Sequence, residues 1–165
     1  MFTSDYNILF AFLTSLLVTY FIIPKIIIVS KKFRLSDIPG DRSSHVGSVP
    51  IFGGVAIFFG FMFSLLLWSE LQNVQFLIVS MMIIFFTGII DDLVGLTAYK
   101  KLFFQSIAIL NIIYFGDMQI DNMYQVLGVE ELPDFIATIF TLFVFIVIIN
   151  GFNLIDGVDG LAGGL

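Results

Sequence analysis

Two clusters of polar residues follow apolar segments of this chain. In the first cluster, Asp91 and Asp92 come directly after the apolar run 76–90. The second cluster follows the apolar run 135–149 and repeats every three residues: Asn150, Asn153, Asp156 and Asp159. A carboxylate near the hydrocarbon core of a membrane costs on the order of 3 kcal/mol, so such groups usually serve function. Carboxylate and amide oxygens are also the ligands that Mg²⁺ shares with phosphates, so two clusters on one side of a membrane predict a site for a metal ion and phosphate groups.

Each cluster also has a purely structural interpretation. Asp91 and Asp92 are adjacent, so their side chains diverge by about 100° on a helix, and both could simply cap a helix end as solvated residues. The glycines of segment 151–164 make a regular helix doubtful there, although they let backbone amides approach a phosphate closely. The stretch 156–160 could also be an ordinary turn or part of a calcium-binding loop. We favour the functional interpretation, because two amides and two carboxylates in register after an apolar run are hard to explain as a turn.

The segments that must position these residues are strongly apolar. Of the 165 residues, 59% are hydrophobic and 12% charged, whereas ordinary globular domains carry roughly 25% charged residues. Lipid is therefore the expected solvent, and the apolar runs predict five membrane-spanning helices: 8–29, 51–68, 76–90, 102–115 and 135–149. The first run is long enough to cross a bilayer core of about 30 Å, whereas the last two are shorter and could instead be re-entrant or core helices. Pro24 is expected to kink or end the first helix.

The charged residues divide between the two faces that five crossings would create. One face holds all seven basic residues: Lys25, Lys31, Lys32, Arg34, Arg42, Lys100 and Lys101. The other face holds acidic residues and no basic residue. By the positive-inside rule the basic face is cytoplasmic, which places both polar clusters at the cytoplasmic face and the N-terminus outside. We therefore predict an all-α, polytopic membrane helical bundle with five transmembrane helices and the start of a sixth.

The cytoplasmic loop 30–50 carries a third set of candidates. Arg42 and His45 lie three residues apart and could contact an anion, while Gly53 and Gly54 would allow close helix packing at the start of the next span. The alternative is a juxtamembrane basic loop attracted to anionic lipid head groups, and a lone histidine is more often structural than catalytic. On the opposite face, residues 116–133 are expected to form either a short hairpin or a polar connector.

Three motifs make the chain resemble the polyprenyl-phosphate N-acetylhexosamine-1-phosphate transferases. They occur in the order found in that family: Asp37-x-Pro39-x-x-Arg42-x-x-His45-x-x-x-x-Pro50-x-x-Gly53-Gly54, then Gly88-Ile-Ile-Asp91-Asp92, then Asn150-x-x-Asn153-x-x-Asp156-Gly-x-Asp159-Gly-Leu-Ala-x-Gly164. This membrane family includes the bacterial enzymes that initiate O-antigen and teichoic-acid glycans, and the phospho-MurNAc-pentapeptide transferase of peptidoglycan synthesis. His45 and the stretch 50–54 are closer to the GlcNAc-1-phosphate branch than to the pentapeptide branch, which typically has a lysine and a Thr-Pro-Thr-Met-Gly-Gly run here.

The resemblance implies a phosphoglycosyltransferase reaction at the inner membrane of a bacterial cell. The phosphate of polyprenyl (undecaprenyl) phosphate would attack the β-phosphorus of a UDP-sugar, giving a polyprenyl-diphosphate sugar and UMP, to start a cell-envelope polysaccharide. Mg²⁺, with Mn²⁺ as a substitute, would offset the repulsion between phosphates, about 4 kcal/mol per pair of unit charges 4 Å apart at an effective dielectric constant near 20. The same resemblance makes Asp91 and Asp92 the catalytic candidates and Asn153 the metal-contact candidate. The implied substrate-binding candidates are Asn150, Asp156, Asp159, Arg42 and His45.

The resemblance makes residues 1–165 the N-terminal part of a single multi-pass transferase domain. The family continues for several more spans, with a later cytoplasmic aspartate and a histidine-rich loop, so we expect this chain to be truncated and inactive alone. We expect membrane, lipid-phosphate and UDP-sugar partners and no nucleic acid, and we leave a homodimer open. An ion- or proton-coupled membrane transporter fragment is the alternative, disfavoured because the aspartates lie at span ends; a non-catalytic assembly partner is a further one. The sugar is not predicted, since the sugar-selecting elements of the family lie largely beyond Leu165.

Overall fold

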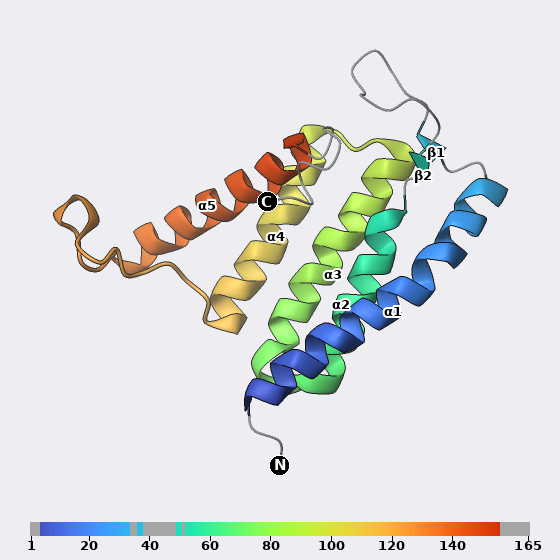
Figure 1. Cartoon of the computed structure of the whole chain (residues 1–165). Coiled ribbons are helices and arrows are strands. Elements are labelled where there is room, and N and C mark those ends of the chain that lie inside the picture. The colour runs from blue at the N-terminus through green and yellow to red at the C-terminus, as the bar shows by residue number, and fades with distance from the viewer. Residues whose placement is uncertain (1–3, 34–35, 38–48, 51, 156–165) are drawn as a thin grey trace. The chain divides into compact units, whose positions relative to one another are not determined.

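The computed structural model describes residues 4–33, 36–37, 49–50 and 52–155 of the chain. It divides into two compact units, Met1–Asn73 and Val74–Leu165, which are described separately below (Figure 1). Five α-helices account for most of the described residues. Over these residues, each of the five predicted spans coincides with one α-helix, so the all-α class predicted from the sequence is confirmed.

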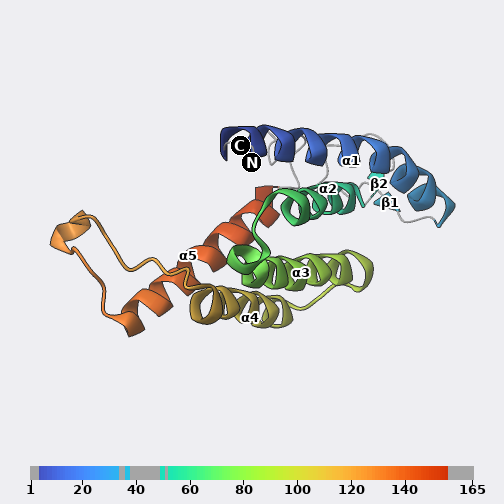
Figure 2. The same cartoon turned by 90° about the horizontal axis from the view of Figure 1, so that it is seen from below.

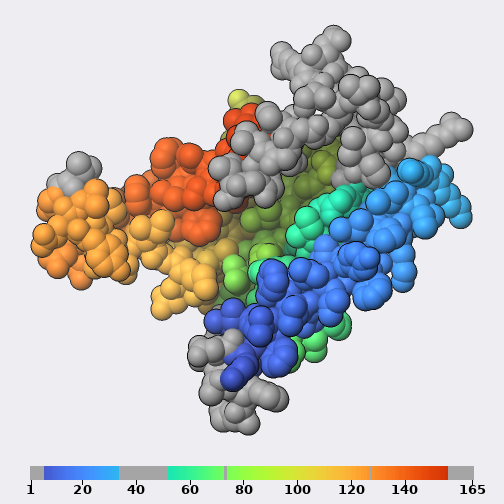
Figure 3. All heavy atoms as spheres, viewed as in Figure 1, coloured from blue at the N-terminus to red at the C-terminus, as the bar shows by residue number. Residues whose placement is uncertain are grey.

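In the first unit, two apolar helices pack against each other through side-chain hydrogen bonds to backbone. The elements of this unit are α1 (Ser4–Lys32), β1 (Ser36–Asp37), β2 (Val49–Pro50) and α2 (Gly53–Trp68), with β1 and β2 paired antiparallel. Ser64 on α2 donates to the carbonyl oxygen of Ala11 on α1 at 2.7 Å. Trp68 donates from Nε1 to the Thr14 hydroxyl at 3.0 Å and stacks on Phe10. Figure 3 shows the side chains of α1 (blue) lying along those of α2.

Helices α1 and α2 lie close together at Gly60. A Cβ added there would collide with the hydroxyl of Thr19 and would lie 2.8 Å from the carbonyl oxygen of Ser15. Ala56, one turn earlier on α2, is completely buried. Small residues at such positions let two membrane helices approach closely and gain dispersion energy that lipid cannot supply. This pair of small residues therefore fixes the contact between α1 and α2.

The second unit begins within α3 and contains the helices that carry the polar clusters. Its elements are α3 (Leu71–Val94), α4 (Ala98–Gly116), the 3₁₀ helix η1 (Val126–Gly128) and α5 (Asp134–Ile155). Gly95 ends α3 in a left-handed conformation (φ 73°), and its N–H donates to the carbonyl oxygen of Asp91 at 2.8 Å. Glycine adopts this conformation without steric cost. The turn reverses the chain within a few residues, and Figure 2 shows α3 and α4 side by side.

Two polar side chains, one of them completely buried, join α3 to α4 within their apolar surfaces. Ser80 is completely buried and donates to the carbonyl oxygen of Ala108 at 2.6 Å. Asn111 donates to the carbonyl oxygen of Phe76 and to the Ser80 hydroxyl, both at 2.9 Å. Because an unsatisfied polar group in an apolar medium is costly, these bonds favour one relative position of the two helices.

The connection from α4 to α5 doubles back on itself. Met123 donates from its backbone N–H to the carbonyl oxygen of Glu130, and Leu132 donates in the same way to Asp121, both at 2.8 Å. Of the two alternatives predicted for residues 116–133, the hairpin is the one observed. Its first part is tied to α5, because the backbone N–H of Ile120 donates to the buried Thr141 hydroxyl at 2.8 Å.

Three of the described helices are long and apolar enough to cross a membrane: Tyr6–Lys32, Val74–Val94 and Asp134–Ile155. Helix α2 has 16 residues, or about 24 Å at 1.5 Å per residue, and α4 carries two lysines and the buried amide of Gln105. The number of crossings and the orientation therefore stay predictions. Pro24 lies inside α1, which continues to Lys32, so the predicted end of the helix at Pro24 does not occur. Exposed apolar side chains such as Phe12 (63%) and Phe143 (62%) suit lipid as the surrounding medium.

Candidate functional site

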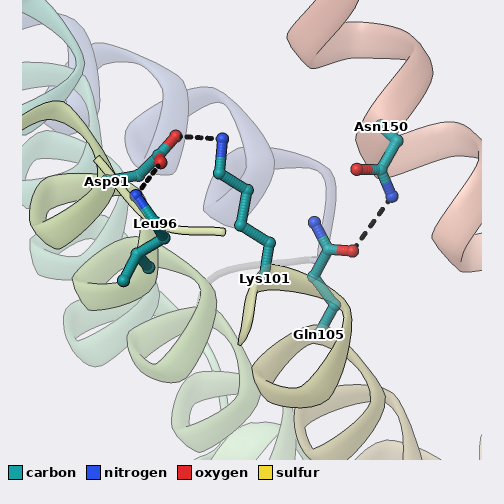
Figure 4. Close-up of polar contacts among 5 residues, drawn as sticks. All are labelled: Asp91, Leu96, Lys101, Gln105 and Asn150. Atoms are coloured by element: carbon teal, nitrogen blue, oxygen red, sulfur yellow. Dashed lines mark hydrogen bonds and ion pairs between the residues drawn. The ribbon is translucent and has the colours of Figure 1, made fainter. Parts of the chain in front are cut away.

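Asp91 is held at the end of α3 by contacts through both of its carboxylate oxygens. Its Oδ2 lies 2.5 Å from Nζ of Lys101 on α4, and the side chains of the pair are 21% and 26% exposed. Its Oδ1 accepts a hydrogen bond from the backbone N–H of Leu96 at 2.9 Å (Figure 4). Asp92, the next residue on the helix, is exposed. Asp91 is thus fixed against the cation of Lys101, and the divergence of the two adjacent carboxylates stays a prediction.

The contacts of Asp91 fit both interpretations of Asp91 and Asp92, as residues that cap a helix end and as residues of a functional site. The bond from Leu96 ties the carboxylate to the loop after α3, as a residue at a helix end would do. The bond from Lys101 adds a charge-assisted contact to the next helix. A half-buried carboxylate next to a lysine at a helix end is a site where an incoming phosphate could take the place of the carboxylate beside the lysine.

Asn150 lies within α5 and makes two hydrogen bonds through its amide nitrogen. Nδ2 donates to the carbonyl oxygen of Ile146 at 2.8 Å and to Oε1 of Gln105 on α4 at 3.0 Å. Gln105 is 5% exposed. The helix continues through Gly151 to Ile155, so the doubt about a regular helix after residue 150 is wrong for this part. Asn153, one turn beyond Asn150, is exposed.

Helix α4 joins the two polar clusters. Lys101 and Gln105 are one helical turn apart, at i and i+4, and therefore lie on the same side of α4. Lys101 contacts Asp91 on α3, and Gln105 contacts Asn150 on α5 (Figure 4). Asp91 and Asn150 are thus brought to the same end of α4, although they come from distant parts of the sequence.

The sequence analysis missed Lys101 and Gln105 as parts of this site. Lys101 was counted only with the basic residues that set membrane orientation, and Gln105 was not singled out. A signal was present, because Gln105 is an amide inside the apolar run 102–115, one turn after a lysine. A polar residue inside an apolar helix needs a hydrogen-bond partner. A contact between Gln105 and an amide on another span was therefore a prediction that the sequence supports.

The other candidates lie outside the described residues. These are Arg42, His45, Asp156 and Asp159. Within the described part of the chain, no group of three or more His, Cys, Asp or Glu residues could hold a metal ion. The oxygens of Asp91, Asp92, Asn150 and Asn153 are nevertheless hard donors of the kind that Mg²⁺ accepts alongside water and phosphate. The chemistry of the donor set therefore fits a magnesium ion shared with a phosphorylated ligand.

Residues 74–165, which include both clusters, match the family described as Glycosyl transferase family 4. This chain belongs to glycosyl transferase family 4. Among curated family-4 proteins, the phospho-N-acetylmuramoyl-pentapeptide-transferase of Borrelia garinii is 34% identical over 99% of this chain and 52% of the relative. The undecaprenyl-phosphate alpha-N-acetylglucosaminyl 1-phosphate transferase of Escherichia coli O157:H7 is 29% identical over 83% of this chain and 38% of the relative. No solved structure matches.

Membership of glycosyl transferase family 4 confirms the resemblance drawn from the three motifs. The names of the relatives favour the transferase class over the transporter class, and with the long apolar helices they indicate a membrane protein. This family-4 chain spans about half the length of the curated relatives it matches. The relative with the higher identity and coverage is named for the pentapeptide reaction, whereas the motif details favoured the GlcNAc-1-phosphate branch.

Proposed function

We propose that this chain forms part of an enzyme that transfers a sugar-1-phosphate from a UDP-N-acetylhexosamine to a polyprenyl phosphate and releases UMP. The observation that carries the proposal is the arrangement on α4, where Lys101 and Gln105 link Asp91 to Asn150. In this arrangement an anionic lipid and a nucleotide sugar could meet at one helix end. Family membership supports the reaction class, since its named relatives include transferases acting on undecaprenyl phosphate.

The residues of the chain have distinct roles in this proposal. Asp91 receives the proton of the lipid phosphate or orients that phosphate, and Lys101 moves from Asp91 to the incoming phosphate and offsets its charge. Asn150 and Asn153 present amide oxygens toward a magnesium-bound diphosphate, with Asp92 in support. Magnesium would supply charge neutralisation and orientation of the leaving UMP. Asp156, Asp159, Arg42 and His45 are proposed as further substrate contacts.

The proposed location is the bacterial inner membrane, with five crossings, the N-terminus outside and the active-site loops in the cytoplasm. The lipid tail would lie in the bilayer and the nucleotide sugar would arrive from the cytosol. Both polar clusters would then face the compartment that supplies the donor. The basic residues gathered on this face support the orientation.

We propose GlcNAc-1-phosphate as the transferred group, on the basis of His45 and the stretch 50–54. Phospho-MurNAc-pentapeptide is the second candidate, favoured by the 34% identity to the Borrelia garinii relative. The two candidates share the acceptor and differ in the donor. One assay with both donors therefore separates them.

The test is a transfer assay. The polypeptide that the complete reading frame around this sequence encodes is purified and reconstituted in lipid nanodiscs. Undecaprenyl phosphate and Mg²⁺ are supplied with radiolabelled UDP-GlcNAc or UDP-MurNAc-pentapeptide, and labelled lipid is extracted. We expect labelled lipid with UDP-GlcNAc, its loss on chelation of Mg²⁺, and its loss in Asp91→Asn and Asn153→Ala. Product from the pentapeptide donor alone would assign the second candidate, and no product from either donor would overturn the proposed function.

A further inference from the structure

Gln105 is a buried amide of α4, and the turn that follows it on the same side of the helix is apolar. It is 5% exposed, and Ala108 and Ile109 on the following turn are buried with it. An amide in such surroundings costs several kcal/mol if its polar atoms find no partner. Gln105 accepts a hydrogen bond from Asn150, a residue of the candidate site. The cost of burying Gln105 is thus offset in part by a contact from its Oε1 to a functional candidate.

The partners of Asn150 decide which way both amides point. The carbonyl oxygen of Ile146 can only accept a hydrogen bond, so the Asn150 atom facing it is the amide nitrogen. The same nitrogen faces Gln105, so the Gln105 atom opposite it must be Oε1. Both N–H groups of Asn150 are therefore used within the protein.

This arrangement leaves two polar atoms available for a ligand. Among the described residues, Oδ1 of Asn150 and Nε2 of Gln105 make no hydrogen bond. Figure 4 shows the nitrogen of Asn150 directed at Gln105 and its oxygen directed away from that contact. If Gln105 were apolar, the Asn150 amide would lose one of its two restraints and could turn its nitrogen toward the ligand instead.

We infer that Gln105 is a positioning residue that holds Asn150 with its carbonyl oxygen toward a cation–diphosphate ligand. This inference rests on the proposed function, because it assigns the ligand of that same site. Residues that orient the groups in contact with a metal typically change metal affinity or activity by about 10–100-fold when they are replaced. Gln105 acts through Asn150 and is not itself a catalytic residue.

The test compares Gln105→Leu with Gln105→Glu in the reconstituted polypeptide. Leucine removes the acceptor for Asn150, whereas glutamate retains an oxygen in the same place. We expect Gln105→Leu to lower kcat and to raise the Mg²⁺ concentration for half-maximal activity, by about 10-fold or more in combination. We expect Gln105→Glu to restore most of both values. Unchanged kcat and unchanged Mg²⁺ dependence in Gln105→Leu would overturn the inference.

Asn111→Leu is the matched control, since Asn111 is also an amide of α4 that donates to another helix. We expect this variant to lower stability and leave the Mg²⁺ dependence per folded molecule unchanged. An equal Mg²⁺ shift in Asn111→Leu would reduce Gln105 to a structural role.

A second measurement does not depend on turnover. In protein labelled with ¹⁵N on asparagine and glutamine side chains, we expect the Asn150 amide protons to exchange slowly and Gln105→Leu to accelerate their exchange. Rapid exchange in the parent protein would refute the contact even in an active enzyme. If the parent protein transfers neither sugar, the proposed function fails. The inference about Gln105 is then tested by this exchange and by Mg²⁺-dependent binding of UDP. Binding of UDP that Gln105→Leu does not weaken would overturn it.

Discussion

Replacing Lys101 with methionine removes the cation from Asp91 and keeps an unbranched side chain that is one atom shorter. The bond from Leu96 to Asp91 is unaffected, because it comes from backbone. A half-buried carboxylate would then lose its charged partner while its own charge remains. We expect the variant to have a lower free energy of unfolding, and we expect this loss of stability to disappear when Asp91 is also replaced.

The size of the effect follows from the geometry of the pair. A charge-assisted hydrogen bond contributes about 1.5–3 kcal/mol, and Nζ of Lys101 is in direct contact with Oδ2 of Asp91. The side chains of Lys101 and Asp91 are 26% and 21% exposed, so water screens the interaction and the lower end applies. We therefore expect a loss of about 1.5 kcal/mol, roughly a tenfold change in the folding equilibrium constant.

A double-mutant cycle measures this quantity. The free energy of unfolding in mixed micelles is obtained from titration with dodecyl sulfate, followed by circular dichroism, for Lys101→Met, Asp91→Asn and the double variant. We expect a coupling energy of about 1–1.5 kcal/mol. Lys100→Met removes the same charge from the neighbouring exposed residue, and we expect a change within about 0.5 kcal/mol. A coupling energy near zero, or an equal loss in Lys100→Met, would refute the ion pair.

Two further predictions concern packing and topology. Gly60→Ala drives a methyl group into the Thr19 hydroxyl and should destabilise the chain by about 1–3 kcal/mol, whereas Gly88→Ala, which meets nothing within 4 Å, should be neutral or stabilising in the same unfolding titration. The chain has no cysteine, so a single cysteine introduced at Lys100 or at Glu130 can report orientation. A membrane-impermeant maleimide should label the cysteine at position 100 only from the cytoplasmic side and the cysteine at position 130 only from outside. Labelling of both positions from one side would refute the five-crossing topology.

The helices were predictable because they depend on composition along the chain. Apolar runs of sufficient length form helices in lipid, where the backbone must satisfy its own hydrogen bonds. The boundaries were less predictable, since α3 continues past the end of its apolar run at residue 90 to Val94. Hydrogen bonding carries the helix through Asp91 and Asp92 until Gly95 adopts a positive φ. Polar residues at a span end do not stop a helix.

The partners within the site were not predictable in the same way. The predicted topology and the family resemblance placed Asp91 and Asn150 in one site, but neither predicted that α4 would join them. Which faces of two helices meet depends on their rotation and crossing, and these are set by side-chain packing such as the Ser80–Asn111 contact. Lys101 was therefore identified only as a charge on the cytoplasmic face, and Gln105 was overlooked.

Helix α4 carries the contact of Lys101 with Asp91 and the contact of Gln105 with Asn150 on neighbouring turns. A ligand that displaces Asn150 along the axis of α4 would pull on Gln105 through their hydrogen bond. Because Lys101 is on the same helix, it would be displaced together with Gln105. Occupancy on the amide side would thereby alter how firmly the lysine grips Asp91, and the reverse would hold with equal free energy. Under the proposed function, the lipid phosphate and the nucleotide sugar would in this way influence each other's binding before they react.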